Sequence, residues 1–142
     1  MTAALGVVAV LIGSLVVVGQ LISVLDFERA QRLGLQEPSA GSDRLHRRLE
    51  LSAARWDVLI LWILVPTGIA MLIDTSWWPW LALISGGAYV DAGGREASKV
   101  LMLRTEGVRV GTRQETRVLL GFHALMVAVG VTLIAHALVV VI

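Results

Sequence analysis

The sequence predicts an all-α polytopic membrane protein in which four transmembrane helices form one bundle. Of its 142 residues, 56% are hydrophobic and only 16% are charged, whereas about a quarter of the residues in a soluble domain are charged. The excess apolar surface is therefore expected to face lipid. The apolar residues also gather into four stretches, at residues 3–25, 56–73, 77–100 and 116–141. Each is close to the roughly 20 residues that cross a bilayer, so we expect a single transmembrane domain over residues 1–142.

Charge, cysteine usage and motifs exclude several classes of function. A net charge of +1 provides no basic surface for nucleic acid. The chain has no cysteine, which excludes disulfides, thiolate catalysis and zinc–thiolate or iron–sulfur sites. It also has no HExxH motif, EF-hand loop, phosphate-binding loop or Ser/His/Asp set. The sequence thus predicts no catalytic residue and no metal site, and it favours a protein that is not an enzyme.

The first stretch, residues 3–25, is expected to be a transmembrane helix rather than a signal peptide. It lacks a basic leading segment, and its apolar run is longer than that of a signal peptide. Gly6, Gly13 and Gln20 are spaced seven apart, so they lie on one helix face. Small residues on such a face allow another helix to approach closely.

Residues 26–55 form the longest polar segment and contain two expected elements. A loop is indicated by turn-forming residues, namely Pro38, Ser39, Gly41 and Ser42. After it, apolar residues recur at helical spacing, at Leu45, Leu49, Ala53 and Trp56. This pattern predicts a short amphipathic helix that lies in the membrane interface before the second span and runs into it. Its arginines, Arg44, Arg47 and Arg48, either snorkel from a solvated connector or bind anionic lipid headgroups.

The second and third spans are expected to form an antiparallel hairpin, because only residues 74–76 separate them. Pro66 is expected to kink the second span and to free a backbone carbonyl, which the Thr67 hydroxyl can help to satisfy. The third span begins with an aromatic cluster typical of a membrane–water interface, formed by Trp77, Trp78 and Trp80. Paired glycines seven apart, at 86–87 and 93–94, predict a second close-packing face.

The fourth helix is expected to begin near Arg113, since Thr112 and Glu115 form a capping-box pattern just before the last apolar run. Its small residues form a further stripe, at Gly121, Ala124, Ala128 and Thr132. One chain of four helices encloses little space, and such stripes suggest additional helix partners. Besides the lipid bilayer, we therefore expect further copies of this chain or other membrane subunits as partners.

The arginines predict the orientation. All of them lie in the connections after the first and third spans, except Arg95 within the third span, and the turn at 74–76 contains none. Because arginine-rich connections stay in the cytoplasm, we expect both connections inside and both termini outside, in a plasma membrane of the bacterial inner-membrane type.

Polar residues of all four spans are expected to share one layer in the cytoplasmic half. At about 1.5 Å per residue, Asp91 lies about 21 Å along the third helix from Trp77, and His123 about 9 Å from Arg117. Asp91 and Arg95, and likewise Glu96 and Lys99, have the spacing of helical ion pairs. The candidate layer comprises Gln20, Asp57, Asp91, Arg95, Glu96, Lys99 and His123.

Three interpretations of this layer remain open. Paired charges can simply fix the register of the bundle, as in a non-catalytic structural or assembly subunit of a larger membrane complex. Alternatively, ionisable groups at this depth often mark pathways for ions, protons or small polar solutes. This favours an oligomeric channel, transporter or transport-complex component, with Asp91 as the central group, Arg95 as its partner and His123 as a proton acceptor.

The third interpretation concerns the histidines of the fourth span. His123 and His136 are about 20 Å apart along the helix axis, which would suit one haem ligand in each leaflet. Two b-type haems with two histidines each need four ligands, and the remaining histidine, His46, lies in a connection. A homodimer would have to supply the missing pair. A haem b electron carrier is thus an alternative, and otherwise no cofactor is predicted.

Overall fold

The computed structural model describes residues 1–36 and 42–142, and helices make up 85% of these described residues. The helices are α1 (Thr2–Leu25), α2 (Phe27–Arg32), α3 (Arg44–Ile60), the 3₁₀ turn η1 (Leu61–Ile63), α4 (Leu64–Leu72), α5 (Trp78–Thr105) and α6 (Arg113–Val141). No strand occurs in the described ranges, so the all-α class is confirmed. The loop expected at Pro38, Ser39 and Gly41 lies outside these ranges.

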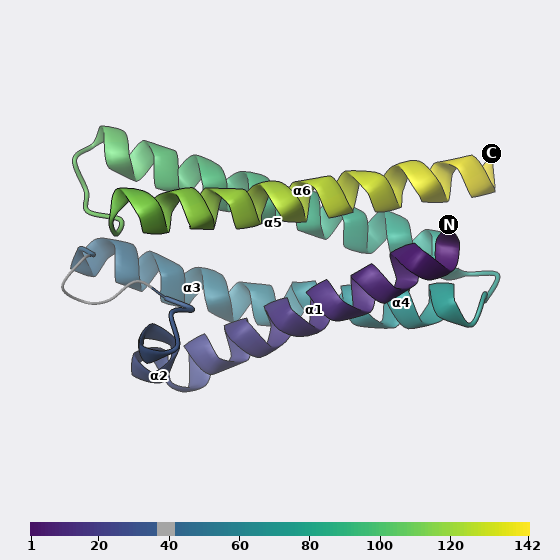
Figure 1. Ribbon diagram of the computed structural model, residues 1–142, viewed down its shortest axis with the longest axis horizontal. Coiled ribbons are helices and arrows are strands. Elements are labelled where there is room, and N and C mark those ends of the chain that lie inside the picture. The colour runs from purple at the N-terminus through teal and green to yellow at the C-terminus, as the bar shows by residue number, and fades with distance from the viewer. Residues whose placement is uncertain (37–41) are drawn as a thin grey trace.

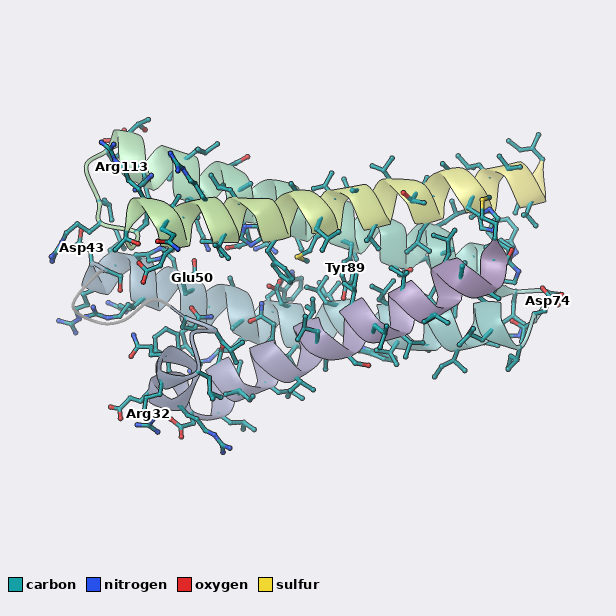
Figure 2. The ribbon with its side chains drawn as sticks, in the orientation of Figure 1. Arg32, Asp43, Glu50, Asp74, Tyr89 and Arg113 are labelled. Carbon is teal, nitrogen blue, oxygen red and sulfur yellow. The ribbon has the colours of Figure 1, made fainter. Side chains whose placement is uncertain are left out.

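The long helices run along a common axis, and α3, η1 and α4 follow one another as a single interrupted helix (Figure 1). Both termini and the turn at Asp74 lie at one end of the molecule, which we call the terminal end (Figure 2). The connection between α5 and α6 and the described parts of the connection between α1 and α3 lie at the other end, the arginine end. The two arginine-rich connections are therefore on the same side of the molecule.

Three helices are long and apolar enough to cross a membrane: Thr2–Leu25, Arg44–Leu72 and Arg113–Val141. The second of these combines α3, η1 and α4. Helix α5 has 28 residues, but it is not among the three, because charged residues between Asp91 and Lys99 shorten its apolar stretch. The length and composition of these three helices suggest membrane localisation, whereas a fourth crossing by α5 stays a prediction.

Glycines bring α1 against α4 and α5 against α6. A Cβ added to Gly6 would lie 2.9 Å from the carbonyl oxygen of Gly68, and one added to Gly130 would lie 2.5 Å from that of Gly86. Gly93 packs equally closely, since its added Cβ would be 2.7 Å from the carbonyl oxygen of His123. The close-packing faces predicted for the first and third spans are thus confirmed at Gly6, Gly86 and Gly93, which contact helices of the same chain, whereas an added Cβ at Gly87 or Gly94 would meet nothing within 4 Å.

The interruption of the second long helix has an identifiable cause. The 3₁₀ turn η1 ends three residues before Pro66, whose ring prevents regular helical hydrogen bonding to the carbonyl of Trp62. The Thr67 hydroxyl donates to the carbonyl of Ile63 at 2.8 Å, which is not the carbonyl that Pro66 frees, so the expected hydrogen bond does not form. The Tyr89 hydroxyl of α5 donates to the carbonyl of Leu61 at 3.4 Å. The irregular turn therefore binds α5 through a side chain that is 0% exposed.

The amphipathic segment before the second span runs directly into that span, as the sequence predicts. It is the first part of α3, which continues without a break to Ile60. Its buried positions are His46, Ala54 and Asp57, whereas Leu45 and Trp56 are exposed. His46 and Asp57 therefore point into the protein, whereas Leu45 and Trp56 point outward. Leu49 of the apolar stripe packs against the buried cluster of Val100, Leu103 and Val110.

A clamp joins the two connections at the arginine end. Ser42 and Val110 form an antiparallel bridge, and the Arg109 amide donates to the Asp43 carboxylate at 2.8 Å. This backbone hydrogen bond lowers the pKa of Asp43 below its ordinary value of 3.8. Because the pKa of Asp43 is lower in the folded state than its ordinary value, the ionised carboxylate stabilises the clamp at pH values above 3.8. This stabilisation is lost as the pH falls through the lowered pKa.

The clamp predicts a specific cross-link. Residues opposed in an antiparallel bridge have Cα atoms about 4.5–5.5 Å apart, within the range of about 4.4–6.8 Å that a disulfide spans. Because the chain contains no cysteine, the double variant Ser42→Cys/Val110→Cys should form one intramolecular disulfide on mild oxidation, detectable by mass spectrometry. Ser42→Cys/Thr75→Cys, whose cysteines lie at opposite ends, should not. Equal cross-linking of both pairs would contradict the arrangement.

Candidate functional site

Asp57 of α3 connects three helices. Its Oδ2 accepts a hydrogen bond from Gln20 Nε2 of α1 at 3.2 Å, and its Oδ1 accepts one from Arg95 Nη2 of α5 at 3.2 Å. The Asp57 side chain is only 5% exposed. A buried carboxylate is tolerated when it is paired and hydrogen-bonded, and here both oxygens are engaged.

The ion pairs continue from Arg95 toward the arginine end. Arg95 Nη1 donates to Glu96 Oε1 at 3.2 Å, and the ammonium of Lys99 pairs with the other oxygen of Glu96. The same ammonium lies 2.8 Å from Glu50 Oε1. We call Glu50, Asp57, Arg95, Glu96 and Lys99 the ion-pair cluster. It contains three carboxylates and two cations, so one negative charge is left over when all five groups are ionised.

The structure brings together most of the predicted polar layer, namely Gln20, Asp57, Arg95, Glu96 and Lys99. It adds two residues that the sequence analysis missed. Glu50 pairs with Lys99, and the buried His46 places its Nδ1 3.7 Å from Glu50 Oε1. A signal was present, since His46, Glu50 and Asp57 fall at helical spacing on one face of α3. The apolar stripe of Leu45, Leu49, Ala53 and Trp56 lies on the adjacent face of the same helix.

A cavity of about 690 Å³ adjoins the cluster. It lies between α1, α3, α5 and α6, and residues of α2 and of positions 34–36 also line it. Its polar wall includes four residues of the predicted layer, Gln20, Asp57, Glu96 and His123, together with Glu50 and Glu115. Among the described residues no lysine or arginine lines the cavity, so the two cations of the cluster lie behind its acidic wall.

The cavity occupies only one half of the molecule. Thr112 and Glu115, at the start of α6, line it, and their hydrogen bonds form the predicted capping box. Its lining does not include the buried Tyr89, which lies midway along the molecule in Figure 2. Beyond Tyr89, a hydrogen bond of 3.1 Å joins Thr67 to Ser85. The other half contains a smaller cavity of about 130 Å³ between α1 and α6, whose lining carries no charged side chain. The acid-lined cavity is therefore a vestibule on the side of the arginine end.

Asp91, the expected centre of the layer, lies elsewhere. Its carboxylate is 3.6 Å from Arg95 Nε, but its side chain is 71% exposed and it does not line the cavity. His123 is buried and lines the cavity. The geometry thus favours Asp57 over Asp91 as the central acidic group.

The remaining candidate histidine, His136, lies at the terminal end. Its Nε2 is 2.9 Å from the Thr2 hydroxyl, and its ring stacks on Trp78 with centroids 5.3 Å apart. Iron at Nε2, a usual axial ligand atom, would displace the Thr2 hydroxyl. The contacts of His136 therefore provide no support for the haem alternative.

The three candidate lipid-binding arginines differ in their surroundings. Arg47 donates to the carbonyl of Ser42 at 2.7 Å, which ties it to the clamp. Arg44 and Arg48 are exposed in the first turns of α3. The latter two are therefore the better placed to reach lipid headgroups.

Comparison with known proteins assigns no function to this cavity. No protein-family model matches the chain, and searches of curated proteins and of solved structures find no match.

Proposed function

We propose that the protein is a small integral membrane protein with four membrane-crossing helices, and that it passes a proton or a monovalent cation through the vestibule. It would act as an oligomer or as part of a transport complex, with the arginine end in the cytoplasm. The observation that carries this proposal is the acid-lined cavity in one half of a chain whose other half has a smaller cavity without charged lining residues. Such an arrangement is what a solute site accessible from one side requires.

Membrane crossing by α5 has support from its contacts. Its glycine face packs directly on α6, and three of its charged side chains, Arg95, Glu96 and Lys99, are paired within the ion-pair cluster. Charged residues within membrane segments are tolerated when they pair and face the bundle interior or a water-filled cavity. These charges therefore agree with a fourth span, although they lower its hydropathy.

Asp57 is the group through which a bound ion would act. It holds Gln20 of α1 and Arg95 of α5 at the same time. A proton or cation that arrives at its carboxylate competes with Arg95 for the same charge. Weakening this pair loosens α3 from α5 beside the cavity. Binding of a proton or cation at Asp57 would thereby be coupled to the relative positions of α1, α3 and α5.

Proton flux tests this proposal directly. The purified protein is reconstituted into vesicles that contain a pH-sensitive dye, and a potassium diffusion potential is applied. Flux above that of protein-free vesicles is expected, and Asp57→Asn should bring it down to their level. Asp74→Asn is the control, since Asp74 lies in the turn at the terminal end with a φ of 51° that asparagine also adopts. Wild-type flux equal to that of protein-free vesicles would contradict the proposal.

A second candidate function, a subunit that docks another membrane helix, is favoured by the exposed carboxylate of Asp91. Gly87, Asp91 and Gly94 lie on one stripe of α5, and an added Cβ at either glycine would meet nothing within 4 Å. Asp at the centre of a lipid-exposed helix costs about 2.5–3.5 kcal/mol, which a partner helix carrying a basic residue would relieve. If the protein has this function, another membrane protein should co-purify with it, and the chain alone should show no proton flux. Asp91→Ala should then abolish co-purification of the partner.

A further inference from the structure

We propose that the cavity binds a monovalent organic cation with an apolar body, such as a substituted ammonium or phosphonium ion. This inference rests on the proposed function, because it names the class of ligand for the same cavity. Three observations carry it: the charge balance of the ion-pair cluster, the engagement of its oxygen atoms, and the composition of the opposite wall.

The charge balance favours a cation. Glu50, Asp57 and Glu96 face only Arg95 and Lys99 within the cluster. The three carboxylates line the cavity, whereas the two cations do not. Any mobile charge inside therefore lies nearer to the acids than to the bases. In a site of low dielectric constant, one unpaired charge attracts a counter-ion strongly, and the sign of the wall excludes an anion.

The carboxylate oxygens favour an organic ion over a bare metal ion. Hard cations such as Ca²⁺ and Mg²⁺ need about six or more oxygen ligands in contact. Both oxygens of Asp57 already accept hydrogen bonds, from Gln20 and Arg95. Both oxygens of Glu96 are likewise engaged, by Arg95 and Lys99. The cluster can therefore supply a negative potential more readily than it can supply a coordination shell.

The opposite wall suits an apolar body. It includes aliphatic residues of α1 and α6 together with the aromatic ring of Phe122 and the thioether of Met126. Aromatic faces attract organic cations, and methionine adapts to ligands of varied shape. Sites for small organic molecules typically enclose about 300–1,000 Å³, and this cavity encloses about 690 Å³. The volume therefore matches an organic molecule and far exceeds the size of a single dehydrated ion.

Two imidazoles face this site and could change its charge. His46 of α3 lies 3.7 Å from Glu50 Oε1, and His123 of α6 lines the cavity. A protonated imidazole at either position would cancel the excess charge. Binding is therefore measured at pH 8, well above the ordinary histidine pKa of about 6.5.

The test is equilibrium binding of radiolabelled tetraphenylphosphonium to the full-length protein in detergent, corrected for protein-free micelles. Saturable binding is expected, and tetraphenylborate, which has the same shape and the opposite charge, should neither bind saturably nor compete. Asp57→Asn and Glu50→Gln each remove one wall charge, and each should weaken binding at least tenfold. Asp74→Asn, at the terminal end, should bind like the wild type. Having two wall variants keeps the test decisive if one of them fails to fold.

Three results would overturn the proposed ligand: no saturable binding, equal binding of the borate, or unchanged affinity in both wall variants. The flux assay separates this failure from failure of the proposed function. Proton flux without phosphonium binding would remove the organic-cation site and leave the transport proposal intact. Phosphonium binding without any flux would support the site and contradict transport.

Discussion

Arg95→Met is expected to lower the free energy of unfolding by about 3 kcal/mol, because removing one partner of a buried ion pair leaves the other charge uncompensated. Arg95 contacts the buried carboxylates of Asp57 and Glu96, both at 3.2 Å. We expect the low end of the range of about 3–5 kcal/mol for such changes, since Arg95 itself is 39% exposed. Reversible unfolding in mixed detergent micelles, followed by circular dichroism, measures the effect.

The controls for Arg95→Met lie on the same helix and in the same pair. Arg104→Met, at an exposed position near the end of α5, should change stability by less than about 0.5 kcal/mol. In the double variant Arg95→Met/Asp57→Asn, part of the loss should be recovered, because directly interacting residues show coupling of about 0.5–3 kcal/mol. Strictly additive losses in the double variant would show that this ion pair does not carry the effect.

Gly130→Leu is expected to destabilise the packing of α5 on α6 by about 3 kcal/mol or more. Even the first carbon of a side chain at Gly130 would lie 2.5 Å from the carbonyl oxygen of Gly86 and 3.0 Å from the Val90 amide nitrogen. Both are backbone atoms, so α5 as a whole would have to move. Overpacking of this kind typically costs about 1–3 kcal/mol, and more where the backbone must shift. The same unfolding assay provides the measurement.

Gly121→Leu is the matched control on the same helix. An added Cβ at Gly121 meets nothing within 4 Å, and leucine is a better helix former than glycine by up to about 0.8 kcal/mol. This variant should therefore be neutral or slightly more stable than the wild type. If Gly121→Leu and Gly130→Leu were equally destabilised, the close contact between α5 and α6 would not be the cause.

The exposed position of Asp91 bears on both candidate functions. Its carboxylate retains one partner in Arg95, at 3.6 Å, but most of its surface is open. Within a bilayer this surface would favour contact with a polar group of another helix over contact with lipid. The stripe of small residues on α6 at Gly121, Ala124, Ala128 and Thr132 is likewise exposed. Outward-facing small residues on two helices agree with the oligomer or complex that the sequence suggests.

Much of the fold was predictable, because its signals are local. Apolar runs located three helices that can cross a membrane, the Thr112–Glu115 pair located the start of α6, and the arginines marked one end of the molecule. Glycines seven apart identified the close-packing faces of α1 and α5. Each of these patterns depends on residues that are close together in the sequence. They can therefore be recognised without knowing how the helices pack.

The composition of the site was decided by tertiary structure. Helical spacing places Asp57 and Asp91 at similar depths, but depth does not reveal which way each helix is rotated about its own axis. Packing against α6 through Gly86 and Gly93 turns Asp91 outward, and the inward polar face of α3 brings Glu50 and Asp57 to the cavity. In a membrane protein an apolar stripe can face lipid or another helix, so the spacing of apolar residues does not determine which face of α3 is buried. Only the contacts between helices could therefore select Asp57, rather than Asp91, as the carboxylate that faces the vestibule.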